Sequence, residues 1–183
     1  VLPMSSSPEL HDNSAEAFIT PNSTYDLALM RYTFEELTRL ANILGYTEDA
    51  DKWTQLLSNM DEFPVDTDGC LKIARDERLM ESHRHFSPLM PIHPLRQIRY
   101  ESDEEKRIID GSIASIEDLG IFYYVGYSFC WLAELYVIQR NAEKAYAELE
   151  RFWNYFCLPN GFHANGDYKN QFEMNWHYRP FTL

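Results

Sequence analysis

Residues 126–140 limit the fold of this chain more than any other segment. As a helix they carry apolar side chains on nearly every side, which is typical of a helix buried on most of its faces. The apolar side chains are Phe129, Trp131, Leu132, Leu135, Tyr136 and Ile138. The longest mostly apolar uncharged run, residues 119–133, is shorter than the ~20 residues that a membrane-spanning helix needs. We therefore predict an inner helix of a folded helical domain and expect no membrane partner.

Four other segments repeat apolar residues at the spacing of a helix face. Residues 25–44 do so and end at Gly45, which suits a left-handed C-terminal cap. A second helix is predicted over residues 48–60, a third begins at Asp103, and Asn141 is a candidate N-cap for the last. The apolar face of the last helix comprises Ala142, Ala145, Tyr146, Leu149, Phe152, Trp153 and Phe156. Polar residues opposite that face predict a surface helix packed on the inner one.

Long polar segments join these helices. Residues 1–24 and 81–99 lack a sustained apolar period and predict irregular loops. Residues 70–74 alternate loosely after a turn and predict a small strand or hairpin, and residues 158–183 predict loop and short strand. Inner and outer helices joined in this way are typical of helical-hairpin folds, and no repeat of roughly 33–47 residues indicates a solenoid. We predict an all-α fold of helical hairpins with long irregular loops.

Composition narrows the class of partner. The formal net charge is −13, from 29 acidic and 16 basic residues, and no basic cluster could follow a phosphate backbone. Nucleic acid is therefore excluded as an expected partner. Aromatic residues make up 15% of the chain, and they suit either a helical core or platforms for the flat apolar faces of a sugar.

The cysteines and serines show no pattern typical of a disulfide framework, a zinc site or a nucleophile. Cys70, Cys130 and Cys157 are an odd number with wide spacing, so we interpret them as small core residues. No Gly-x-Ser-x-Gly element surrounds any serine. The sequence leaves the cellular compartment open.

Glu9 is a candidate general acid. It follows Pro8, whose ring fixes the chain direction, so its carboxylate could be presented from a stiff turn. A general acid needs that rigidity and apolar neighbours that raise its pKa. The alternative is a solvated loop carboxylate or a neighbour of a helix N-cap.

The run His83-Arg84-His85 is a second candidate site. In an extended chain the side chains of His83 and His85 share a face with that of Glu81. The run could bind a sugar or a carboxylate, form structural hydrogen bonds, or hold a metal together with His93. No fourth ligand has motif spacing, and the charge of Arg84 opposes a cation, so we expect no metal and no cofactor.

Three short elements together resemble glycoside hydrolase family 95, the α-L-fucosidases. They are the Ser-Pro-Glu that ends at Glu9, the His-Arg-His-x-Ser of residues 83–87, and the Gly-Tyr-Ser of residues 126–128. The resemblance extends to Leu89, residues 94–98, Trp131 and Leu135. It implies a central (α/α)6 toroid and hydrolysis of terminal α-L-fucose or related L-galactose residues with inversion. It also implies that Glu9 is the general acid and that Arg84 and His85 bind the sugar, with His83 beside them.

The chain departs from the family pattern at two positions. Leu10 stands where the family usually has Asn, and Tyr127 stands where it favours Trp. The asparagines that position the attacking water precede this region in the family, and the Asp that supports them follows it. An inverting mechanism needs an acid and a water-activating group on opposite faces of the sugar, about 6.5–9.5 Å apart when both are carboxyls. We therefore expect residues 1–183 to be a single helical fragment of the catalytic domain, inactive when isolated.

Two further expectations follow. A fragment of a toroid should leave an apolar flank uncovered, and such a flank favours self-association. The alternative to a glycosidase fragment is a non-catalytic carbohydrate-binding domain or a helical interaction domain.

Overall fold

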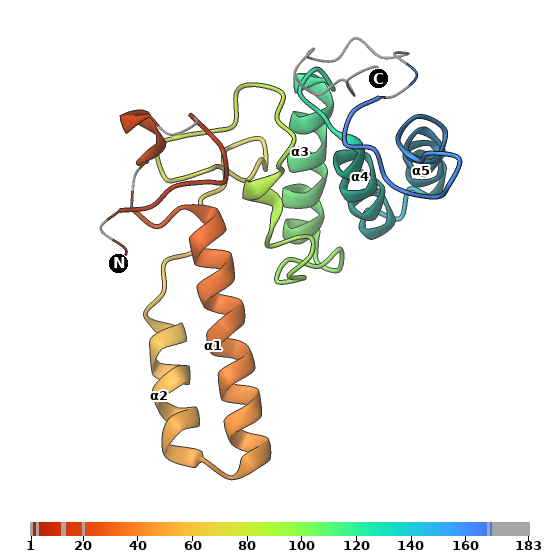
Figure 1. Cartoon of the computed structure of the whole chain (residues 1–183). Coiled ribbons are helices and arrows are strands. Elements are labelled where there is room, and N and C mark those ends of the chain that lie inside the picture. The colour runs from red at the N-terminus through yellow and green to blue at the C-terminus, as the bar shows by residue number, and fades with distance from the viewer. Residues whose placement is uncertain (1, 3, 12–13, 20, 168, 170–183) are drawn as a thin grey trace. The chain divides into compact units, whose positions relative to one another are not determined.

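The computed structural model describes residues 2, 4–11, 14–19, 21–167 and 169, which form two compact units. The first unit comprises residues 1–66, 71–78 and 87–98, and the second comprises residues 67–70, 79–86 and 99–183. Among the described residues there are five α-helices, two short 3-10 helices and no named strand (Figure 1). The predicted all-α fold is confirmed.

The first unit contains a helical hairpin of α1 (Thr24–Leu44) and α2 (Thr47–Ser58), which lie side by side in Figure 1. The Ser23 hydroxyl caps α1 by accepting from the Asp26 amide at 3.1 Å. Gly45 ends the helix with φ 80°, as its position after the last apolar residue predicts. The two helices match the sequence prediction to within about two residues at each end.

The predicted strand or hairpin at residues 70–74 is wrong. This segment forms only isolated bridges, between Val65 and Leu71 and between Ala74 and Glu77. The start of α1 takes the backbone groups that a partner strand would need. The Thr24 amide donates to the Ile73 carbonyl at 2.8 Å, and the Thr24 hydroxyl donates to the carbonyl of Lys72 at 2.6 Å. The segment therefore serves to anchor the N-terminus of α1.

The second unit contains α3 (Asp103–Leu119), α4 (Gly126–Ile138) and α5 (Ala142–Phe156). A capping box between Ser102 and Glu105 begins α3, and the Asn141 side chain begins α5 by accepting from the Lys144 amide at 3.2 Å. Helices α4 and α5 pack as a hairpin. The predicted inner helix is confirmed, since Phe129 and Leu135 of α4 are fully buried.

Aromatic rings fill much of the core of the second unit. Phe86 contacts Tyr124 with ring centroids 5.2 Å apart, and Tyr124 in turn contacts Phe129 at 5.6 Å. Phe129 then contacts Phe156 of α5 at 5.0 Å, which joins α4 to α5. These rings are therefore core residues. Cys70 is buried as predicted, whereas Cys130 and Cys157 are half-buried, and the three thiols form no disulfide.

Helix α5 does not bury all of its predicted apolar face. Tyr146, Leu149 and Trp153 are 69%, 48% and 68% exposed. Of the predicted face only Ala145 and Phe156 are buried, and Glu148 is buried beside them. The helix has two adjoining apolar stripes, and the ion pair between Glu148 and Arg151 allows the polar position between them to face inward. The exposed stripe is an uncovered apolar flank, and self-association through it stays a prediction.

None of the helices described is both long enough and apolar enough to cross a membrane.

Candidate functional site

The His-Arg-His segment lies in the second unit, where two serines fix it to the start of α4. The Ser82 hydroxyl donates to the Gly120 carbonyl at 2.8 Å and accepts from the Tyr123 amide at 3.1 Å. The Ser128 hydroxyl, on the first turn of α4, donates to the Arg84 carbonyl at 2.9 Å. The backbone of the segment is therefore held on both sides of His83, a condition for a precise binding site.

Three rings follow one another at this position. The ring centroids of His83 and His85 are 5.4 Å apart, and those of His85 and Tyr127 are 5.5 Å apart. The His83 ring is buried, whereas His85 and Tyr127 are half-buried. The two histidines thus share a face, as the sequence predicts, and Tyr127 of α4 extends the row.

Hydrogen bonds fix how the His83 ring is held. Nδ1 of His83 lies 3.1 Å from the backbone N–H of His85, from which it can accept, and 3.2 Å from the His85 carbonyl oxygen, to which it can donate. Either contact ties the orientation of His83 to the backbone of the residue that is expected to bind the sugar.

The Tyr127 hydroxyl faces the edge of the His85 ring. Its oxygen lies 2.8 Å from Nδ1 and 3.2 Å from Nε2, so the bond to Nδ1 is the shorter of the two. A tryptophan has only an indole N–H at this place and could not both donate and accept there. Sequence reasoning noted Tyr127 only as a departure from the family pattern and missed its contact with His85.

A fourth ring, His163, lies against the first residue of α4. A Cβ on Gly126 would clash with Nε2 of His163 and lie 2.8 Å from its Cδ2. The Gly126 amide donates to the Asn165 carbonyl at 3.0 Å, which holds this loop in place. Burial lowers the pKa of His163, which favours the neutral ring. One feature of the sequence indicates such a contact, the glycine at the start of an otherwise apolar helix.

Glu9 lies in the first unit, on a turn that the Leu10 amide closes by donating to the Ser7 carbonyl at 3.1 Å. Glu9 and His11 both have φ of 58°, a conformation that few non-glycine residues adopt. Such backbone strain clusters at functional sites. The side chain of Glu9 is exposed, so the expected apolar surroundings are absent among the described residues.

A buried hydrogen bond joins two segments of the first unit. The hydroxyls of Ser7 and Ser87 bond to each other, and the two residues are 3% and 1% exposed. Ser7 precedes Glu9 by two residues, and Ser87 follows His85 by two. The serines of Ser-Pro-Glu and of His-Arg-His-x-Ser therefore meet inside the first unit.

The alternative metal site would consist of His83, His85 and His93. Within the described part of the chain, no three His, Cys, Asp or Glu residues are grouped closely enough to hold a metal ion.

In this all-α fold of helical hairpins, His83 and His85 on a loop lie beside Tyr127 in the first turn of α4, which places polar side chains together on a helical scaffold. The family comparison identifies the scaffold, because residues 1–183 match the glycosyl hydrolase family 95 catalytic domain. The chain belongs to this family of glycoside hydrolases, whose catalytic domain is an α/α toroid. A carbohydrate substrate follows from the family. Comparison with curated proteins gives no match.

Proposed function

We propose that this chain supplies the general acid and part of the sugar-binding site of an inverting glycosidase that acts on terminal α-L-fucoside-like bonds. Glu9 is the acid in this proposal, and Arg84, His85 and His83 form the sugar-binding group. The observation that carries the proposal is the buried bond between Ser7 and Ser87. It supports the proposal because each serine is fixed within the first unit and is only two residues along the chain from a proposed site residue, Glu9 or His85.

In the proposed reaction the Glu9 carboxyl gives its proton to the departing glycosidic oxygen. A water molecule attacks the anomeric carbon from the opposite face, and a base outside residues 1–183 takes the proton of that water. Inversion follows from this single displacement. We further propose that the isolated chain does not turn over substrate, because it supplies the acid without the water-activating group.

The sugar-binding residues have separate tasks in the proposal. The Arg84 guanidinium offers five donors in a fixed fork, and the His85 ring offers a directed donor or acceptor to a sugar hydroxyl. His83 contacts the His85 backbone through Nδ1 and so holds the run in one conformation. Tyr127 fixes the edge of the His85 ring.

The test replaces Glu9 with Gln in the complete protein that contains this chain. Turnover is compared on two α-L-fucosides, one with a poor and one with an activated leaving group. General acid assistance is worth about 10²–10⁴-fold where the departing oxygen needs a proton, so Glu9→Gln should lose that factor on the poor leaving group and far less on the activated one. The exposed Glu16→Gln is the matched control. Equal losses on both substrates would exclude Glu9 as the acid.

Carbohydrate binding without turnover is a second candidate, and the exposure of Glu9 favours it. The two candidates differ in one measurement. A complete protein that binds α-L-fucosides but releases no sugar from them would support the binding function and exclude the glycosidase. For the glycosidase, NMR should show β-L-fucose as the first product from an α-linked substrate.

A further inference from the structure

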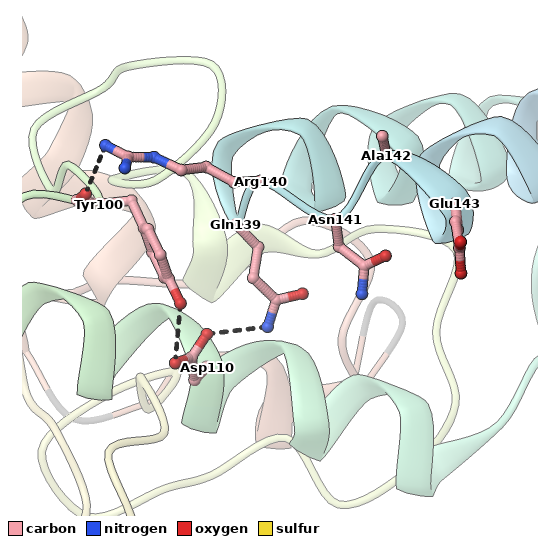
Figure 2. A pocket seen from close by; sticks show the side chains of 7 residues that line it. All are labelled: Tyr100, Asp110, Gln139, Arg140, Asn141, Ala142 and Glu143. Carbon is pink, nitrogen blue, oxygen red and sulfur yellow. Dashed lines mark hydrogen bonds between the residues drawn. The ribbon is translucent and has the colours of Figure 1, made fainter.

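The second unit has a surface pocket that no part of the proposed active site uses. It has a volume of about 520 Å³, within the range of small-molecule sites. Its lining comes from the loop before α3, from the middle of α3, and from the turn that joins α4 to α5 (Figure 2). Tyr127 is the second residue of α4 and Gln139 follows its last, so at 1.5 Å per residue the helix separates them by about 18 Å. One monosaccharide could not occupy both places.

One wall of the pocket is held by hydrogen bonds to Asp110. The Tyr100 hydroxyl donates to its Oδ2 at 3.2 Å, and Nε2 of Gln139 donates to its Oδ1 at 2.8 Å. Both carboxylate oxygens thus have a partner, as Figure 2 shows. The oxygen of the Gln139 amide differs from its nitrogen, because Oε1 is buried and accepts no hydrogen bond from any described residue.

The opposite side of the pocket offers donors. Arg140 donates a long bond, 3.4 Å, from Nη2 to the Tyr100 carbonyl, and its guanidinium carbon lies 5.9 Å from the centroid of the Tyr100 ring. The Asn141 side chain caps α5 through Oδ1, which leaves its Nδ2 as a donor toward the same space (Figure 2). The pocket therefore has one buried acceptor without a donor, Oε1 of Gln139, and two groups, Arg140 and Nδ2 of Asn141, that can donate further hydrogen bonds.

The mixed charge of this lining selects the ligand class. An anion would meet the carboxylates of Asp110 and Glu143, and a cation would meet the guanidinium of Arg140. A neutral polyol suits the pocket better, because each hydroxyl can donate to Gln139 and accept from Arg140 or Asn141. The Tyr100 ring adds an apolar surface of the kind that covers a sugar face.

We propose that this pocket is a second carbohydrate-binding site, separate from the catalytic one, that holds a neutral pyranose unit. The Gln139 side chain turns its buried Oε1 into the pocket to accept from a sugar hydroxyl, and other hydroxyls accept from Arg140 and Asn141. The site is independent of Glu9, so it stands whether or not the proposed reaction does.

Two variants test the site without disturbing the fold. Arg140 has φ of 64°, a conformation that glycine adopts without strain, so Arg140→Gly removes the guanidinium from a backbone that favours the change. Asn141→Asp keeps an equally good N-cap but replaces the Nδ2 donor with a carboxylate oxygen. Asn154→Asp, at an exposed position on α5, makes the same charge change away from the pocket and is the control.

The assay is a calorimetric titration of the complete protein with methyl α-L-fucopyranoside and methyl β-D-galactopyranoside. It is performed in a His85→Ala background so that the proposed catalytic site contributes little. Saturable binding should persist there, and each pocket variant should weaken it about tenfold, the cost of one hydrogen bond to a charged or fixed donor. Asn154→Asp should bind as the parent does.

Three outcomes would overturn the proposal. The first is no saturable binding in the His85→Ala background, and the second is equal affinity in Arg140→Gly and in the control. The third is a crystal, soaked with either glycoside, that shows only ordered water at Gln139. Loss of turnover in Glu9→Gln with pocket binding retained would separate the two sites. Pocket binding in a protein that hydrolyses no fucoside would refute the proposed function alone.

Discussion

Gly126 offers a direct test of the contact between α4 and the loop that carries His163. Its φ is not positive, so an alanine could adopt the backbone conformation there without strain. The obstacle is space. The new Cβ would clash with Nε2 of His163 and lie 3.0 Å from the Cβ of Phe156. The Cβ of Phe156 cannot move away without the backbone of α5.

The size of the effect follows from two opposing contributions. Forcing a methyl group into a packed site costs about 1–3 kcal/mol, whereas alanine is favoured over glycine in a helix by about 0.5–1 kcal/mol. Gly126→Ala should therefore lower the free energy of unfolding by about 1–2 kcal/mol. In a His163→Ala background the imidazole is gone and only the contact with Phe156 remains, so the same substitution should be close to neutral.

The measurement is a double-mutant cycle of urea unfolding, followed by circular dichroism, on the parent, both single variants and the double variant. Residues in contact give coupling energies of about 0.5–3 kcal/mol, and a value in this range is expected for the pair. Additive costs, with Gly126→Ala equally destabilising in both backgrounds, would refute the packing of His163 on Gly126.

Three other variants probe the site, the buried acid and the exposed stripe. Tyr127→Phe should weaken sugar binding about tenfold by releasing the edge of the His85 ring. Titration should show this loss in a variant whose free energy of unfolding equals that of the parent, and an unchanged affinity would exclude the positioning role. Burial raises the pKa of Glu148 above 4.5, although Arg151 opposes this rise. The stability that the protonated Glu148 contributes is therefore present below pH 4.5 and is lost as the pH rises through the raised pKa. Glu148→Gln should remove this loss, and unfolding curves measured across the acid range that match the parent would contradict it. Trp153→Lys should reduce self-association in sedimentation experiments without lowering stability, because the side chain is 68% exposed.

The helices could be predicted because each has its own local signals. The apolar period sets the length of α1, and Gly45 stops it where a left-handed residue is needed. Asn141 marks the start of α5 by the same logic, since its side chain replaces a missing backbone acceptor. These signals lie within a few residues of the boundary they define, so they need no knowledge of the rest of the chain.

What could not be predicted depends on partners distant in sequence. Residues 70–74 alternate as a strand would. However, the Thr24 amide, far earlier in the chain, bonds the Ile73 carbonyl, so the segment anchors a helix and does not pair as a strand. On α5 the period predicts the burial of Ala145 and Phe156, but the exposure of Tyr146 and Trp153 depends on how the helix packs on α4. The contact of Tyr127 with His85 is of the same kind, because it joins residues 42 positions apart.

The His-Arg-His-x-Ser element shows why its separate residues matter together. His83 and His85 face the start of α4 in the second unit, whereas Ser87 is buried in the first unit against Ser7. The chain therefore passes from one compact unit to the other within a single short motif. Any change in the anchoring of Ser87 would be transmitted to His85 through two residues of backbone. We infer that the serine belongs to the motif for placement and the histidines for binding, which predicts that Ser87→Ala would weaken sugar affinity although its hydroxyl touches no sugar.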